Sequence, residues 1–252
     1  MRRCAPMLLV LLFLAAFVAG AQNAIAGGGS FLTLPALMIG GLDARAANIT
    51  STIALFPGQV TTSWAGRRLV CGTEQLSLRF LFAICLFGGA IGAWLLLATP
   101  SAFFARLIPW LVLFATGVFT WGNFIRKPPE PGRHLNPRLS VPMLFAIAIY
   151  GGYFGGGIGF LMTAALGLIG LAVRPAVGTK NALVAAANAS AVLVFLFAYK
   201  IAWVQAIVVA LGAIGGGWCG AWMLTRINDR ALRLAVVAIG LVLTVGLFVR
   251  AP

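Results

Sequence analysis

The sequence contains very few charged residues, and acidic ones are the rarest. Of its 252 residues, four are Asp or Glu, one is His, and 9% are charged in total. A soluble domain carries about 25% charged residues. With 62% hydrophobic residues and a mean hydropathy of +1.04, this composition excludes a soluble enzyme, a disordered chain and a nucleic-acid-binding domain. It predicts an all-α membrane protein that crosses the bilayer several times.

The scarcity of carboxylates and histidines also restricts the possible chemistry. The acidic residues lie in predicted connectors or at the ends of apolar runs, and the histidine lies in a proline-rich connector: Asp43, Glu74, Glu130, Asp229 and His134. No intramembrane carboxylate is available to bind a cation or to relay a proton. We therefore expect no catalytic residues, no metal site and no cofactor, and we predict that the protein is not an enzyme.

Cysteine is equally uninformative as a source of chemistry. The four cysteines form no CxxC pair, and Cys85 and Cys219 lie inside apolar runs. A thiol-redox membrane protein is therefore disfavoured, and the buried cysteines are interpreted as small apolar residues.

Most of the charged residues in the chain are basic. There are 18 Lys and Arg, which give a net charge of +14. Because they stand mainly between the apolar runs, we interpret them as determinants of membrane topology and as contacts for anionic lipid headgroups. We expect no nucleic-acid partner.

Apolar runs long enough to span a bilayer recur along the chain. A hydrocarbon core about 30 Å thick requires about 20 residues of helix, and the candidate spans are 7–26, 46–66, 80–98, 107–125, 140–158, 177–199, 201–224 and 231–249. Two further runs, 30–42 and 159–171, are short for a span. The first run also fits a cleaved signal peptide, but we interpret it as the first membrane helix because it continues into a glycine-rich segment that recurs later.

The chain repeats itself at a shift of 129 residues. Residues 27–55 and 156–184 are identical at eleven aligned positions, and a second glycine-rich pair, 88–94 and 216–222, aligns at a shift of 128. Such duplication is typical of transporters, which often contain broken helices at the interface of the repeats. We therefore predict a first repeat at 1–125, a basic proline-rich connector at 126–139 and a second repeat at 140–252.

The topology has two solutions. If both glycine segments are re-entrant, eight helices cross the membrane and the halves are parallel. If the runs 30–42 and 159–171 also cross, the halves are inverted, and the positive-inside rule slightly favours this arrangement with an external N-terminus. Span length favours the first, so we predict eight spans with two broken or re-entrant segments.

The glycine segments are the first candidate substrate-binding sites. Three consecutive glycines, and a proline in the first copy, permit a helix to unwind, and non-helical backbone at membrane depth is tolerated where it lines a cavity. The N–H groups of a new helix N-terminus can bind an anion, although close helix packing is the alternative use of such glycines. The candidates are Gly27, Gly28, Gly29, Ser30, Pro35, Gly155, Gly156 and Gly157.

Polar residues on the helices that follow these segments are the second set of candidates. Lys180 lies inside an apolar run, where an ionisable residue indicates a functional site, unless its side chain extends to the membrane interface. Asn181 and Asn188 are two helical turns apart and share a face. The full set is Asn48, Thr50, Ser51, Thr179, Lys180, Asn181 and Asn188.

The run GGGSFLTLPALMIGGLDARAANITSTIAL and its second copy GGGIGFLMTAALGLIGLAVRPAVGTKNALVAAANASAVLVF resemble the TauE/SafE sulfite-exporter family. The resemblance covers nearly the whole chain. It implies a permease of the bacterial inner membrane that exports small sulfur-containing anions, such as sulfite, sulfoacetate or related organosulfonates. The glycine triplets, Pro35 and the stretch Thr179-Lys180-Asn181 match the family pattern, and Ala164 stands opposite Pro35 in the second copy.

Two other functions are possible from the sequence alone. A membrane scaffold or assembly factor would not require the duplicated glycine breaks or the polar stripe that this chain has. A cation channel or exchanger would be expected to carry intramembrane carboxylates, which this chain lacks. We therefore predict a permease whose partners are a small anion and the lipid bilayer, with efflux assisted by the membrane potential. The sequence does not indicate an oligomeric state.

Overall fold

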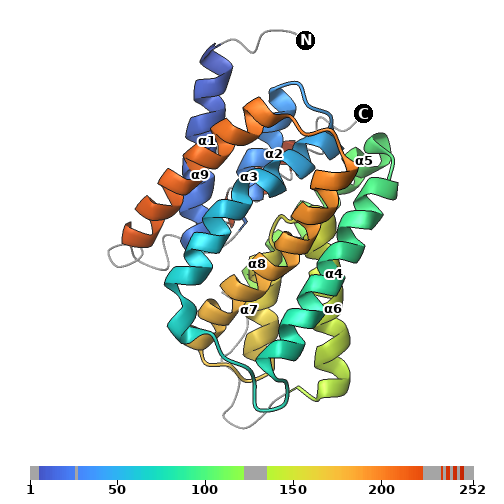
Figure 1. Ribbon diagram of the computed structural model, residues 1–252, viewed down its shortest axis with the longest axis vertical. Coiled ribbons are helices and arrows are strands. Elements are labelled where there is room, and N and C mark those ends of the chain that lie inside the picture. Colours follow the sequence, from blue (N-terminus) through green and yellow to red (C-terminus); the bar gives the residue numbers. More distant parts are fainter. Residues whose placement is uncertain are drawn as a thin grey trace.

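The computed structural model describes residues 6–25, 28–121 and 135–223, together with residues 234, 237–238, 241–242 and 245–246. Within these residues the protein is entirely helical (Figure 1). The helices are α1 (Pro6–Ile25), α2 (Ser30–Ile39), α3 (Ala44–Ala65), the 3₁₀ helix η1 (Arg67–Leu69), α4 (Leu78–Ala98), α5 (Ser101–Thr120), α6 (Pro137–Phe154), α7 (Ile158–Leu168), α8 (Val173–Ala198) and α9 (Trp203–Met223).

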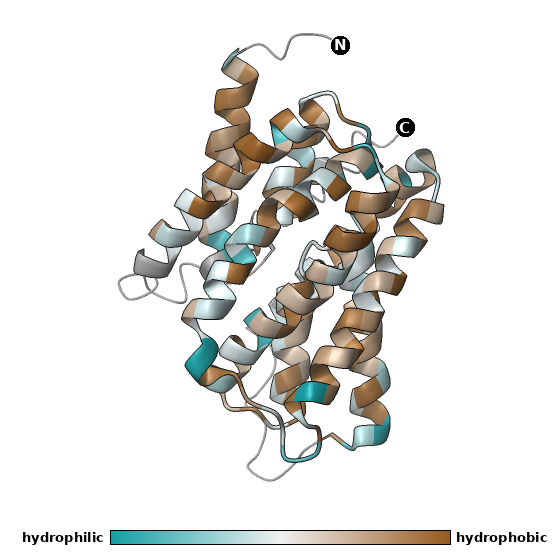
Figure 2. Ribbon diagram, in the orientation of Figure 1, coloured by the Kyte–Doolittle hydropathy of each residue, from teal (hydrophilic) through white to brown (hydrophobic). Residues whose placement is uncertain are grey.

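Five of the described helices are long and apolar enough to cross a membrane: α1, α4, α5, α8 and α9. The protein is therefore a multi-pass membrane protein, and hydrophobic residues dominate most of its helices in Figure 2. Helices α3 and α6 also form near their predicted spans, but they fall outside this apolar group. The predicted span 140–158 is wrong at its end because α6 stops at Phe154. The predicted span 231–249 and the connector 126–139 lie largely outside the described residues.

Each glycine segment separates a long helix from a short one. After α6, Gly155 and Gly157 have φ angles of 73° and 78°, in the left-handed region that glycine adopts without a steric penalty. After α1, Gly28 has a φ of 82°. The values at Gly155 and Gly157 account for the end of α6, and the predicted break at the glycine segment 155–157 is confirmed.

The two copies of the repeat share local geometry. Gly28 and Gly157, which are 129 residues apart, both have left-handed φ angles, and so do Gly41 and Gly170, at 92° and 100°. Each of the second pair ends a short helix, where a left-handed glycine commonly satisfies the terminal carbonyls. Both α2 and α7 are therefore flanked by equivalent glycine turns.

Helices α3 and α8 run in opposite directions. At one end, the guanidinium of Arg45 in the first turn of α3 lies 5.6 Å from the ring centroid of Tyr199, which follows α8. At the other end, Cys71, beyond α3, bonds to the hydroxyl of Thr179 in the second turn of α8. We name these two ends of the helix bundle the Arg45 end and the Arg67 end, after the first described arginines at each.

Packing between the two parts of the chain is reciprocal. Helix α1 packs extensively on α9, and α6 packs on α4. Glycines permit both approaches: a Cβ at Gly216 would overlap the backbone of Phe17, and one at Gly92 would overlap the carbonyl of Ile149. Small residues bring membrane helices together in this way, and the arrangement leaves α3 and α8 in contact at the centre (Figure 1).

An aromatic cluster connects the two glycine breaks. The ring of Phe31, in the first turn of α2, lies 6.2 Å from Phe160 of α7 and 6.3 Å from Phe154 at the end of α6, measured between centroids. A Cβ placed on Gly28 would lie 2.8 Å from the ring of Phe160. The two breaks are therefore close together in the interior, packed through aromatic rings.

Candidate functional site

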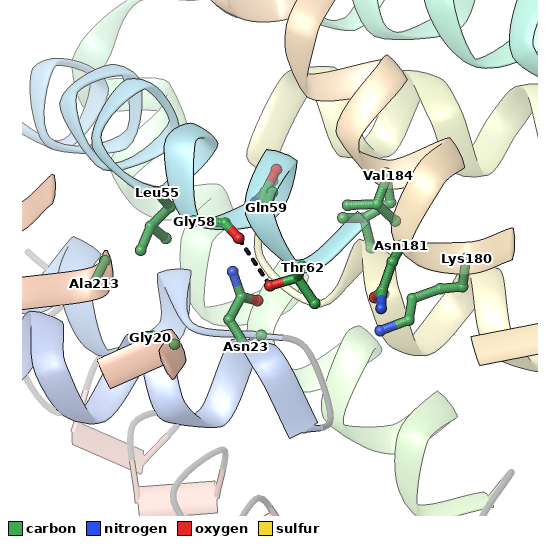
Figure 3. Close-up of a pocket in the computed structure, with 15 residues that line it drawn as sticks. Gly20, Asn23, Leu55, Gly58, Gln59, Thr62, Lys180, Asn181, Val184 and Ala213 are labelled. Atoms are coloured by element: carbon green, nitrogen blue, oxygen red, sulfur yellow. Dashed lines mark hydrogen bonds between the residues drawn. The ribbon is translucent and has the colours of Figure 1, made fainter. Parts of the chain in front are cut away.

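A cavity lies between α1, α3, α7, α8 and α9. Its empty volume is about 560 Å³, part of it open to solvent, and it is displayed in Figure 3. The lining residues are Gly20, Asn23, Gly28, Leu55, Gly58, Gln59, Thr62, Gly155, Ile158, Gly159, Lys180, Asn181, Val184, Ala213 and Gly217. The glycines keep the backbone accessible, and the polar side chains come from three different helices.

Lys180 supplies the positive charge of the cavity. Its side chain is 4% exposed, and it extends from α8 beside Asn181 (Figure 3). Within the described part of the chain no carboxylate forms an ion pair with it. Since a buried ammonium without a counter-ion is costly, the cavity favours a ligand that supplies negative charge.

Neutral hydrogen-bonding groups surround the rest of the cavity. Nδ2 of Asn188 donates to Oε1 of Gln59 at 2.7 Å, which joins α8 to α3. The hydroxyl of Thr62 donates to the carbonyl of Gly58 at 2.8 Å, and Oδ1 of Asn23 accepts from the backbone N–H of Gly29 at 3.3 Å. The side-chain N–H groups of Asn23 and Gln59 can donate to an oxyanion, and these residues add no charge that would repel it.

The glycine candidates occupy the breaks and part of the cavity. Gly28 and Gly155 line it, whereas Gly156 and Gly157 face Phe31 in the aromatic cluster. Gly29 instead packs on the backbone of Ala19. Gly27 lies outside the described residues.

Five further candidates do not line the cavity: Ser30, Pro35, Asn48, Thr50 and Ser51. Pro35 lies inside α2 and is half-buried. Thr50 is 1% exposed on α3, Ser51 bonds to Thr33 at 2.6 Å, and Asn48 donates to the carbonyl of Tyr153 at 3.1 Å. The structure therefore gathers Asn48, Ser51 and Ser30 around the contact between α2, α3 and the end of α6.

The candidates on α8 have different surroundings although Thr179 and Lys180 are adjacent in the sequence. Lys180 and Asn181 line the cavity, and Asn188 reaches it through its bond to Gln59. The hydroxyl of Thr179 points the other way and bonds to both the N–H and the carbonyl of Cys71, each at 3.1 Å. Thr179 therefore anchors the segment after η1 to α8, directly beside the lysine.

Sequence reasoning missed three polar lining residues: Asn23, Gln59 and Thr62. A signal existed for Gln59, since it stands opposite Asn188 at the 129-residue shift. Asn23 immediately precedes the first glycine segment, but a single amide at the end of an apolar run has no distinctive pattern.

The described residues that line the cavity offer a cation and neutral polar groups and no carboxylate. Among the residues that the structure describes, no group of three His, Cys, Asp or Glu side chains could hold a metal ion. The described acidic residues, Asp43 and Glu74, are exposed and belong to connecting segments. One cation, several amide N–H groups and backbone exposed at glycines are therefore the groups that these described residues offer to a ligand.

Comparisons with known proteins identify the family of the chain. The family model described as "Sulfite exporter TauE/SafE" matches residues 12–247. The chain is 29% identical to a "Probable membrane transporter protein" of Haemophilus influenzae, over 94% of this chain and 93% of that one. It is 28% identical to "Probable membrane transporter protein ORF9" of Sinorhizobium sp (95% and 92%) and 27% identical to "Probable membrane transporter protein YfcA" of Escherichia coli K12 (96% and 90%). No solved structure matches significantly. Since the family model covers nearly the whole chain, the protein belongs to the TauE/SafE sulfite exporter family of membrane transporters.

Proposed function

We propose that the protein is a permease of the bacterial inner membrane that exports small sulfur-containing oxyanions, with sulfite as the first substrate to test and sulfoacetate or related organosulfonates as the next. Membership of the sulfite exporter family supports the substrate class. The cavity supports an anionic substrate independently, because Lys180 is the one charged residue among the described residues that line it.

The observation that carries the proposal is the burial of Lys180 at the cavity wall. A lysine that is 4% exposed and has no acidic partner in the described residues costs free energy in an empty site. An oxyanion would offset that cost by pairing with the ammonium, and the amides of Asn181 and Asn23 could donate to its oxygens. Stability is thereby linked to occupancy of the cavity.

The chain is proposed to consist of two inverted halves, 1–125 and 140–252, joined by the connector 126–139. The antiparallel course of α3 and α8 and the equivalent glycine turns at Gly28 and Gly157 support this arrangement. Of the two topologies that the sequence allows, this arrangement is the one with inverted halves and not the one with parallel halves. Transport would then require the two halves to rock about the fixed site.

The Arg67 end is proposed to face the cytoplasm. Basic residues at that end are Arg67, Arg68, Arg79, Arg138 and Arg174, whereas those described at the other end are Arg45, Arg106 and Lys200. The positive-inside rule favours the end with more Lys and Arg. Thr62 lies near the end of α3 and Lys180 near the start of α8, so the cavity lies closer to the cytoplasmic end.

The membrane potential is the proposed driving force. A potential of 100 mV, negative inside, favours expulsion of each negative charge by about 2.3 kcal/mol. A divalent anion such as sulfite gains about 4.6 kcal/mol. Among the residues that the structure describes, no carboxylate or histidine lines the cavity, so a proton relay through side chains is not part of the proposal.

Purified protein reconstituted in proteoliposomes tests the function. Labelled sulfite should cross these membranes faster than it crosses protein-free liposomes, and excess unlabelled sulfite should compete with it. Sulfate and chloride at equal concentration serve as comparison anions. Equal flux with and without protein would refute sulfite transport.

A further inference from the structure

Within the described residues, the cavity of Figure 3 has one charged side chain. Lys180 is 4% exposed, and every other described lining residue is neutral. The polar side chains among the neutral ones are three carboxamides and a hydroxyl, on Asn23, Gln59, Asn181 and Thr62. This wall therefore carries a single positive charge, which one negative charge neutralises and two negative charges exceed.

The charge of a ligand decides whether such a site stabilises it. The attraction to one ammonium grows in proportion to the charge of the anion, whereas the free energy of removing the anion from water grows with the square of its charge. A singly charged anion pairs with Lys180 and leaves the site neutral. A doubly charged anion loses more hydration and leaves one negative charge without a counter-ion. The arrangement therefore favours the singly charged ligand.

The neutral groups of the wall do not take the place of a second cation. The hydroxyl of Thr62 already donates to the carbonyl of Gly58 at 2.8 Å, and Oδ1 of Asn23 accepts from the N–H of Gly29 at 3.3 Å. The side-chain N–H groups of the carboxamides remain as donors. They can orient the oxygens of an anion, but they carry no net charge that would balance a second negative charge.

The arginines at the Arg67 end lie outside the cavity as well. Arg67, Arg68 and Arg174 are exposed, and none of them lines it. The guanidinium of Arg67 donates to the carbonyl of Trp64 at 3.1 Å and lies 4.6 Å from the centroid of its ring. Exposed charges are screened by water and salt, so these arginines attract anions of either charge without distinguishing between them inside the cavity.

We propose that the Lys180 cavity selects singly charged oxyanions and that sulfite occupies it in its singly protonated form, hydrogensulfite. This inference rests on the proposed function and narrows its substrate class. Sulfite exists near neutral pH both as the dianion and as hydrogensulfite, and a proton that arrives on the anion needs no carboxylate or histidine to carry it. Organosulfonates without a second ionised group fit the same rule, whereas sulfate and sulfoacetate carry two charges and do not.

Anion binding to the purified protein in detergent tests the preference without transport. Methanesulfonate and sulfate are matched probes, since both have four groups around one sulfur and stay fully ionised near neutral pH, with one and two charges. Labelled methanesulfonate should bind saturably to the wild type and not to Lys180→Ala. Half-displacement of it should need at least about tenfold more sulfate than unlabelled methanesulfonate at equal ionic strength, since a tenfold difference is only about 1.4 kcal/mol. Equal or stronger displacement by sulfate, or no saturable binding of methanesulfonate, would overturn the proposal.

A second cation in the cavity should change the preference. Thr62→Lys adds an ammonium to the α3 wall and should lower the ratio of half-displacing sulfate to methanesulfonate by about tenfold or more. Thr61→Lys is the matched control: the Thr61 hydroxyl bonds to the same Gly58 carbonyl at 2.8 Å, but its side chain is exposed and does not line the cavity. It should keep the wild-type ratio. An unchanged ratio in Thr62→Lys would contradict selection by charge, and the wild-type comparison decides the question if this variant does not fold.

The charge that crosses the membrane with sulfite provides an independent measurement. In proteoliposomes with the same pH on both sides, the equilibrium distribution of sulfite should change tenfold for about 59 mV of potential, as for one charge, and not for about 30 mV, as for two. The steeper dependence would overturn the proposal. Selective binding of methanesulfonate without sulfite flux would refute the proposed function and support the charge preference, and sulfite flux with stronger binding of sulfate would do the reverse.

Discussion

Gln59 of α3 and Asn188 of α8 are hydrogen-bonded to each other at 2.7 Å, and they are separated by 129 residues. That separation equals the shift at which the sequence repeats itself. Two equivalent positions of an inverted repeat can contact each other only where the symmetry axis passes between them. The bond therefore marks the centre of the proposed two-fold arrangement, at the wall of the cavity.

The Gln59–Asn188 bond should couple the two halves energetically. Gln59→Leu leaves the buried amide of Asn188 without its partner, Asn188→Leu does the same to the half-buried Gln59, and each should lower stability. The double variant should be more stable than the sum of the single effects implies, by about 0.5–1.5 kcal/mol. Denaturation of the four proteins in the same detergent provides this cycle, and additive effects would show that the bond contributes nothing.

Lys180→Ala should reduce sulfite flux by about tenfold or more, because one charge-assisted hydrogen bond to the anion is lost. Its abundance should be largely retained, since removal of a buried cation without a counter-ion seldom destabilises a protein. Lys200→Ala is the control, because this lysine is exposed at the end of α8. Normal flux through the Lys180 variant at equal abundance would remove the lysine from the anion path.

Gly157→Ala should destabilise the protein. The φ of 78° costs an alanine about 1–2 kcal/mol, and the new Cβ would lie 2.6 Å from that of Ala115. Gly167→Ala, inside α7 and with no atom within 4 Å of the added group, should be neutral or stabilise by about 0.5–1 kcal/mol. Unfolding temperatures of the two variants compare these effects, and equal values would contradict the role given to the glycine break.

Asp43 should make stability depend on pH. Partial burial raises its pKa, but hydrogen bonds from Ser101, Ala46 and Arg45 and the charge of Arg45 outweigh this, so the net pKa is lowered. A lowered pKa contributes stability above the unfolded value of about 3.9, and this stability is lost as the pH falls through the folded pKa. Wild type should therefore lose more stability than Asp43→Asn between about pH 5 and pH 2. Parallel pH profiles would exclude this contribution.

Most helices could be predicted because apolar length is visible in sequence. The spans around α1, α4, α8 and α9 agree with the structure to within a few residues. The end of α6 was misplaced because Gly155–Gly157 is flanked by apolar residues on both sides, so hydropathy continues through a point where the backbone turns. Five of the described helices pass as membrane spans on length and composition. Helix α3 does not, because its polar residues lower its hydropathy, and four of them, Asn48, Thr50, Ser51 and Thr52, are buried against protein.

A site residue could be predicted from the sequence only where its residue type is unusual among its sequence neighbours. Lys180 stands out as a charge in an apolar run, and it does line the cavity. Asn48 and Ser51 are as polar as Asn181, but they face α6 and α2, and sequence spacing does not reveal which neighbour a helix face meets. Gln59 and Asn23 reach the cavity because distant helices bring them there.

Sulfite efflux under a clamped membrane potential tests the central claim most directly. Proteoliposomes loaded with labelled sulfite are set to defined potentials with potassium and valinomycin, at the same pH on both sides and at constant sodium. The account predicts that efflux rises as the interior becomes more negative and falls when the potential is removed, with Lys180→Ala slow at every potential. Efflux that ignores the potential but follows an imposed pH gradient would contradict it.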